Sequence, residues 1–144
     1  MVWKKEYRQD SGGAGQYRGG LGQVMEVEHR EGAPFGIFAT FERVKHPARG
    51  RDGGKPGGNG KLSLASGQEL KAKGFQTIPA GERLVVEMPG GGGFGDPTQR
   101  DPEQVALDAA DGLISRDSAE RDYRVALAAD GCVDGAATGR LRST

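Results

Sequence analysis

The chain has 144 residues, of which 26 are glycine, and its 20 acidic and 20 basic residues cancel. This length suits one domain with a modest core, and the lack of net positive charge argues against nucleic acid or an anionic membrane as a partner. No apolar run approaches the about 20 residues that a membrane-spanning helix needs. The single cysteine, Cys132, suggests a reducing compartment, so we expect a cytoplasmic protein.

Alternating apolar and polar residues predict a β-rich first hundred residues. The clearest case is residues 35–43, where every second residue is apolar and falls on one face of the expected strand: Phe35, Ile37, Ala39 and Phe41. Turn-forming residues at 30–34 precede this strand, so a hairpin with the strand expected at 23–29 is plausible. The other strand candidates are residues 2–8, 61–64, 69–73, 75–78 and 82–88.

Glycine clusters at three places between the expected strands. Residues 10–22 and 89–97 combine glycine with polar and aromatic residues, unlike a flexible linker, so we expect left-handed or closely approaching backbone there. Residues 45–61 predict a long surface loop. The G-x-G-x-x-G spacing within residues 90–95 is not followed directly by a helix, and residues 57–61 lack the Ser or Thr of a phosphate loop, which argues against nucleotide-binding loops.

Helix signals begin after residue 100. Asp101 as N-cap, Pro102 in the first turn and Gln104 three residues after the cap predict a helix that ends at Gly112. Ser115 is a second N-cap candidate, for a helix over residues 117–128.

The elements together predict an α+β fold, with a β-rich body that contains glycine-rich loops, followed by a short C-terminal helical pair. The expected division is a β-rich glycine-loop module over residues 1–100, the helical pair over residues 101–131 and a frayed, flexible tail over residues 132–144.

Few residues point to chemistry. The two histidines and Cys132 do not have the spacing of a metal site, so we expect no metal, and the catalytic residues are unknown. Successive glycine amides can form an anion-binding concavity. If this chain binds a substrate or an anion, the candidates are Ser11, Arg18, Gly90, Gly91, Gly92, Gly93 and Asp96. Arg18 could instead pair with Asp10 or Asp96, and this structural role is the favoured one.

The glycine blocks, in order with their neighbouring segments, resemble the signatures of the hydantoinase B/oxoprolinase family. Residues 10–22 resemble S-G-G-A-G-x-Y-R-G-G-x-G, and residues 89–103 resemble P-G-G-G-G-[FY]-G-D-P-x-x-R-D-P-E. Residues 42–57 are similar to the E-R…G-G-x-P-G segment, and residues 111–123 to the D-G-L-[IV]-S…A…Y ending. The likeness runs from about residue 7 to residue 127.

The resemblance implies a β subunit, or β-like half, of an ATP-dependent enzyme that opens cyclic amides such as hydantoin and 5-oxoproline; related ketone carboxylases share the architecture. It implies a hydantoinase A-like α subunit as partner, which would supply the nucleotide site. Family members are several times longer, and this chain resembles only their C-terminal part. A missing N-terminal β portion, with the candidate metal ligands, is therefore an expected second partner, and no cofactor is expected in this chain itself.

Two hypotheses follow for the isolated chain. It is either the C-terminal module of such a subunit, inactive alone, or a non-catalytic diverged remnant or subunit-interaction module. The second is favoured by the charged residues 46–52, where family members tend to have an apolar Pro-Trp-Gly stretch, and by the lack of an acid–base pair. A neighbouring gene for the missing portion would favour the first.

Overall fold

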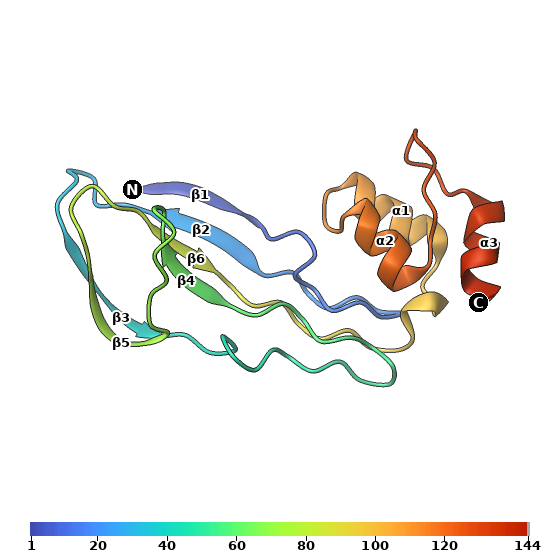
Figure 1. Cartoon of the computed structure of the whole chain (residues 1–144), viewed down its shortest axis with the longest axis horizontal. Helices are drawn as coiled ribbons and strands as arrows, with labels where there is room; N and C mark the ends of the chain where they lie inside the picture. Colours follow the sequence, from blue (N-terminus) through green and yellow to red (C-terminus); the bar gives the residue numbers. More distant parts are fainter. Residues whose placement is uncertain (144) are drawn as a thin grey trace.

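The computed structural model describes residues 1–143 and has, within them, two antiparallel sheets and three α-helices. The larger sheet has the strand order β1-β2-β6-β4. The smaller sheet pairs β3 with β5. Figure 1 shows the sheets at one end of an elongated molecule and the helices at the other, with extended segments between them. The strands are β1 (Val2–Tyr7), β2 (Gln23–Val27), β3 (Phe35–Thr40), β4 (Lys61–Leu64), β5 (Lys73–Ile78) and β6 (Leu84–Glu87). The predicted α+β class is confirmed.

The two sheets pack face to face around an apolar core. Alternation in β3 turns every second side chain toward this core, as predicted, so that Ala39 is 1% exposed whereas Phe38 is 74% exposed. The buried centre consists of Leu64, Ile78, Leu84 and Val86, with Met25, Val27, Phe35, Ile37, Phe41, Leu70 and Met88 packed against it. Burial of these side chains is the main force that holds the sheets together.

The predicted β2–β3 hairpin is wrong, because the two strands belong to different sheets. β2 pairs with β1 and β6, and β3 pairs with β5. Both strands turn an apolar face toward one core from opposite layers, and residues 28–34 carry the chain across. The strand expected at residues 69–73 is also wrong: Glu69 forms only an isolated bridge with Ser63, and β5 starts at Lys73.

Five extended segments connect the sheets with the helical end, and together we call them the glycine bundle: residues 11–15, 18–22, 48–50, 54–60 and 89–95. The first pair joins β1 to β2, the second pair joins β3 to β4, and the last segment leads from β6 to the short 3-10 helix η1 (Pro97–Gln99). The predicted loop at residues 45–61 is irregular and mostly exposed, as expected, up to Lys61, where β4 begins, but it is not wholly on the surface. Residues 48, 57 and 60 within it are buried, because neighbouring segments surround them.

Helix α1 (Pro102–Ala110) starts as predicted, with the Asp101 carboxylate accepting a hydrogen bond from the Glu103 amide at 3.0 Å. Helix α2 (Arg116–Tyr123) has the predicted Ser115 cap but ends earlier than expected, since Arg124 adopts a left-handed conformation with φ 54°. Residues 125–128 continue as extended chain, and Val125 is fully buried there. The helix predicted to reach residue 128 is thus too long.

The predicted frayed tail instead contains a third helix, α3 (Gly135–Ser143). The Asp134 side chain accepts a hydrogen bond from the Ala137 amide at 2.9 Å, which caps this helix. Thr138 is 5% exposed, and its hydroxyl accepts a hydrogen bond from the Ala126 amide at 3.0 Å. Helix α3 therefore packs against the chain that follows α2. The domain boundaries expected at residues 100 and 131 stay predictions.

Candidate functional site

Residues 89–95 are the centre of the glycine bundle. The amides of Gly90, Gly91 and Gly93 donate to the carbonyls of Gly58, Gly20 and Lys55, at 3.1, 2.9 and 2.9 Å. The Gly91 carbonyl in turn accepts from the Gly13 amide at 2.9 Å. These partners come from three different segments, so the central segment is hydrogen-bonded on several sides at once.

Only glycine fits the closest contacts of this bundle. A Cβ atom added to Gly13, Gly90 or Gly93 would lie within 3.0 Å of backbone atoms of a neighbouring segment. The predicted close approach of the backbone is confirmed. The left-handed conformation predicted for residues 89–97 occurs at Gly95, with φ 76°. The glycine pattern of the sequence is therefore a packing requirement of the bundle.

Ser11 lies at the sheet end of the bundle and is 2% exposed. Its hydroxyl donates to the Arg8 carbonyl at 2.5 Å and accepts from the Gly22 amide at 2.9 Å. The Arg8 guanidinium, which sequence reasoning missed, donates to the carbonyls of Asn59 and Met88 at 2.5 and 3.3 Å. These two side chains join the segments that enter and leave the bundle.

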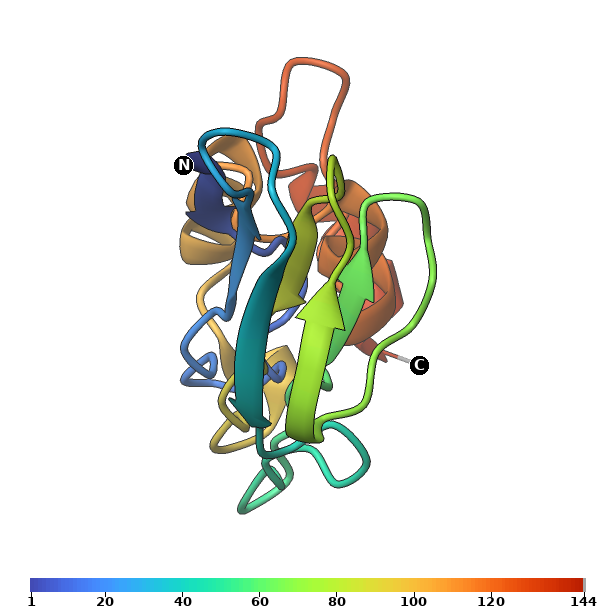
Figure 2. The same cartoon turned by 90° about the vertical axis from the view of Figure 1, so that its left-hand side faces the viewer.

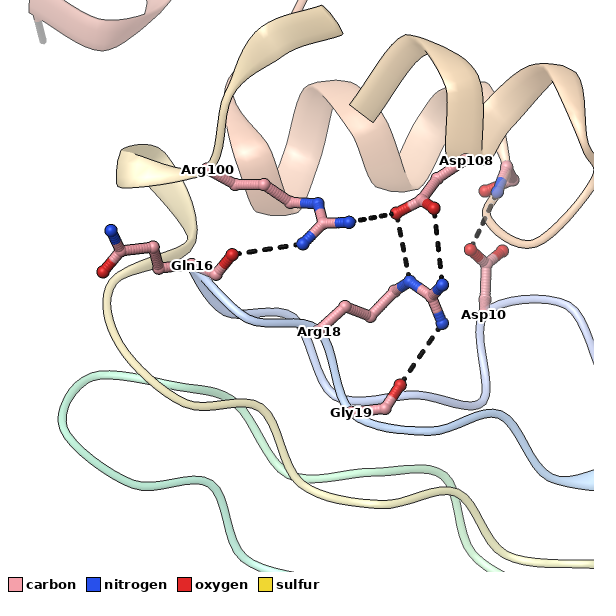
Figure 3. A network of polar contacts seen from close by, with 7 residues as sticks. Asp10, Gln16, Arg18, Gly19, Arg100 and Asp108 are labelled. Carbon is pink, nitrogen blue, oxygen red and sulfur yellow. Dashed lines mark hydrogen bonds and ion pairs between the residues drawn. The ribbon is translucent and has the colours of Figure 1, made fainter. Parts of the chain in front are cut away.

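Arg18 joins the bundle to helix α1 through Asp108 (Figure 3). Its Nε lies 3.1 Å from Asp108 Oδ2 and its Nη2 3.3 Å from Oδ1, while Nη1 donates to the Gly19 carbonyl at 3.3 Å. Arg100 Nη2 lies 2.9 Å from the same Oδ2, and its Nη1 donates to the Gln16 carbonyl at 3.1 Å. The predicted pairing of Arg18 with Asp10 or Asp96 is wrong.

Two guanidinium groups thus share one carboxylate in a largely buried setting. The side chains of Arg18, Arg100 and Asp108 are 16, 16 and 11% exposed. Removing one member of a buried charge group leaves its partners uncompensated, which destabilises a protein by about 3–5 kcal/mol. The sequence carried one signal for Asp108: it follows Val105 by three residues, so it falls on the buried face of the expected helix.

Asp10 and Asp96 have other partners. The Asp10 carboxylate accepts from the Ser115 amide at 2.8 Å, which ties the bundle to the α1–α2 turn. Asp96 caps η1 and is exposed. Its hydrogen bonds from the Thr98 amide and hydroxyl, at 2.9 and 2.8 Å, lower the pKa of the Asp96 carboxyl. Both carboxylates therefore accept backbone amides, Asp10 from a distant part of the chain and Asp96 within its own turn.

Binding of a substrate or an anion by Ser11, Arg18, Gly90, Gly91, Gly92, Gly93 and Asp96 stays a prediction. The structure spreads these residues along the bundle rather than around one cavity. The polar groups described above already have partners in the chain, so a ligand would have to displace internal hydrogen bonds.

Residues 1–143 contain no group of three or more His, Cys, Asp or Glu side chains that could hold a metal ion. His29 accepts from the Glu31 amide at 3.3 Å, and His46 lines an open cavity of about 340 Å³ with Arg43 and Lys45. Burial raises the pKa of Tyr123 to about 12, so this hydroxyl stays protonated at neutral pH. None of the described helices has the length and apolar character to cross a membrane.

Several known proteins are similar to this chain in sequence and in fold. Residues 1–97 match the family model described as Hydantoinase B/oxoprolinase. The chain belongs to this family. The beta subunit of the caprolactamase of Pseudomonas jessenii is 34% identical over 96% of this chain and 25% of its own length. The B subunit of a putative D-/L-hydantoinase of Pseudomonas sp. (strain NS671) is 30% identical over 98% of this chain and 24% of its own.

A solved structure of the ATP-dependent caprolactamase from Pseudomonas jessenii has the same fold, with a TM-score of 0.82 and 28% identity over 99% of this chain. The match covers 26% of that chain. The present hydantoinase B/oxoprolinase member thus spans about a quarter of the length of the relatives it matches. The resemblance expected from the glycine signatures is confirmed.

Proposed function

We propose that this chain acts as the C-terminal part of a hydantoinase B-type β subunit, within an ATP-dependent hydrolase that opens cyclic amides such as hydantoin or 5-oxoproline. Membership of the family supports this proposal. So do the names of two relatives, one from a caprolactamase and one from a putative hydantoinase, both of which match nearly the whole chain.

Within such an enzyme, the role of this chain is that of a rigid scaffold. The observation that carries this proposal is the fit between the family signature and the bundle: the signature glycines lie where backbones touch. The Arg18 side chain of the same signature binds Asp108 of α1. The glycine pattern is therefore accounted for by packing, with no reacting group among these contacts.

The chemistry would come from two partners. A hydantoinase A-like α subunit would supply the ATP site, and an N-terminal β portion would supply the metal ligands. The described residues contain no metal cluster of their own. The names of the two relatives, a beta subunit and a B subunit, support an assembly of several chains. A reducing, cytoplasmic location is the setting that the single cysteine predicts.

A second candidate is a non-catalytic interaction module that has lost the enzyme around it. The segment at residues 46–52 favours it, because Arg49 and Arg51 are cationic and exposed. Such a surface suits a polar contact with a partner better than the apolar stretch that family members tend to have.

Reconstitution distinguishes the two candidates. The chain is combined with a hydantoinase A-like α subunit and a separately supplied N-terminal β portion, and ATP-dependent opening of hydantoin and 5-oxoproline is measured. The proposed function predicts turnover in the complete mixture and none when this chain is left out. A folded chain that forms no complex and adds no turnover would favour the interaction module.

A further inference from the structure

The two outer faces of the sheet sandwich differ sharply in chemistry. On the four-stranded sheet, the outward positions are mostly charged, and oppositely charged neighbours pair with one another. Arg83 lies 2.9 Å from Glu26, and Lys4 lies 3.4 Å from Glu6. Lys61, opposite Glu87 in the register, lies 3.0 Å from Glu69. Trp3 is also exposed beside this face, but Arg83 lies over its ring at 5.6 Å and its Nε1 donates to Glu28 at 2.5 Å. The surface therefore keeps the polar character of a sheet that faces water.

The outer face of the β3–β5 sheet is different. Phe38 and Phe75 are directly opposite each other in the register, and they are 74 and 69% exposed. Their neighbours on this face are small or neutral, Gly36 and Thr77 on one side and Thr40 on the other. The one cation, Lys73, is paired with Glu42.

No other part of the described chain covers these two strands. Figure 2 shows β3 and β5 nearest to the viewer, with no element in front of them. A single exposed aromatic residue is ordinary, but two rings on paired strands of a face with one ion pair form an apolar patch. Both strands are also sheet edges, which proteins usually protect with charge or with a covering element.

We propose that the outer face of β3–β5, centred on Phe38 and Phe75, is the docking surface for the remaining portion of a β-type subunit. This inference rests on the proposed function. The relatives of this chain are about four times longer than the region that it matches. The other three quarters of each relative must therefore pack against a fold like this one. The charged groups of the other outer face are already paired with one another, whereas burial of the apolar β3–β5 face away from water would stabilise a complex.

Cysteine labelling tests the coverage directly. The chain replaces the matching quarter of the caprolactamase beta subunit from Pseudomonas jessenii, with Cys132→Ser as background, and Phe38→Cys is labelled with a maleimide. We expect labelling at least tenfold slower in the fused subunit than in the isolated chain. Glu6→Cys on the charged face is the matched control and should label at similar rates in both. Equal rates for Phe38→Cys in both forms would overturn the inference.

A binding experiment gives an independent test. The probe is the same subunit with its matching quarter deleted, and its own quarter supplied in trans is the positive control. We expect Phe38→Thr with Phe75→Thr to weaken binding of this chain at least tenfold, since central aromatic residues dominate interfaces. Val24→Thr with Val85→Thr, on the charged face, should change it less than about twofold.

The outcomes separate the inference from the proposed function. Binding that survives Phe38→Thr with Phe75→Thr contradicts this docking surface alone. Failure of the unchanged chain to bind, when the native quarter binds, contradicts the proposed function and the docking surface with it. A dimer of the isolated chain in sedimentation that these two substitutions dissociate would assign the face to a second copy and overturn the inference.

Discussion

Neutralising Asp108 is the sharpest test of how the helical end is attached to the glycine bundle. Asp108→Asn keeps the size of the side chain but removes the charge that Arg18 and Arg100 share at 2.9–3.3 Å. Two guanidinium groups, each 16% exposed, are then left facing an uncharged amide. We expect the free energy of unfolding to fall by about 3–5 kcal/mol, the usual cost of breaking a buried charge group.

That loss is a large share of the about 5–15 kcal/mol by which a typical domain is stable. Urea unfolding followed by circular dichroism measures it, with the m-value as a check that the same surface is exposed. Asp111→Asn, at the exposed end of the same helix, is the control and should change stability by less than about 0.5 kcal/mol. The buried setting also predicts little dependence of the loss on salt concentration.

A double-mutant cycle separates the pair from its surroundings. Arg18→Met with Asp108→Asn should cost less than the sum of the single changes, because the first removes a cation that the second leaves unpaired. A loss below about 1 kcal/mol for Asp108→Asn, or strictly additive changes, would refute the assignment of these residues as a buried charge group.

Three further changes probe the bundle and its contacts. Gly93→Ala should destabilise the protein by more than about 4 kcal/mol or prevent folding, as measured by thermal melting. Gly20→Ala is the control, because the space at its Cβ position is open, and it should melt at nearly the normal temperature. Equal melting temperatures for the two variants would contradict the packing. Ser11→Ala leaves the Gly22 amide without its partner and should cost about 1–3 kcal/mol in urea unfolding, and an unchanged midpoint would exclude that role. Burial raises the pKa of Asp122, but hydrogen bonds from Arg121, Lys55 and Ser118 outweigh burial, so the pKa is lowered overall. The ionised Asp122 carboxylate should therefore stabilise the fold at neutral pH, and this stabilisation should disappear as the pH falls below about 4. Asp122→Asn should therefore remove about 1 kcal/mol at pH 7 and progressively less as the pH falls below about 4, and a loss independent of pH would contradict this.

Much of the fold follows from local patterns in the sequence. Alternation placed β3 and its inward face correctly because one side of that strand is buried and the other is not. The caps of α1 and α2 were predictable, since Asp101 and Ser115 satisfy amides within their own helices. Close approach at the glycine blocks was predictable because only glycine permits it.

Most of the errors have one cause, which is that distant contacts decided the local structure. Residues 45–60 are irregular as predicted, but the sequence alone did not show that Gly57 and Gly60 are buried by other segments of the bundle. Val125 fits a helical pattern but is buried in extended chain after Arg124. A local signal existed for α3, where Asp134 caps the helix, and the small residues around it concealed that signal.

The candidate site was predicted less well than the fold. The sequence identified Arg18 but not its partner, because Asp108 lies 90 residues away. It identified Gly90, Gly91 and Gly93 as amide donors but not that the backbone of Gly58, Gly20 and Lys55 accepts these bonds. Pairing across the chain depends on topology, which residue types and spacing do not reveal.

The central claim is that the glycine signature builds a rigid scaffold, and amide hydrogen exchange measures this directly. Gly91 and Gly93 each donate at 2.9 Å to another segment of the bundle. We predict that the two bundle amides exchange as slowly as those of the buried strand β6, and so only with global unfolding. Exchange of Gly91 and Gly93 at rates close to those of an unfolded chain would show a mobile loop and contradict the account.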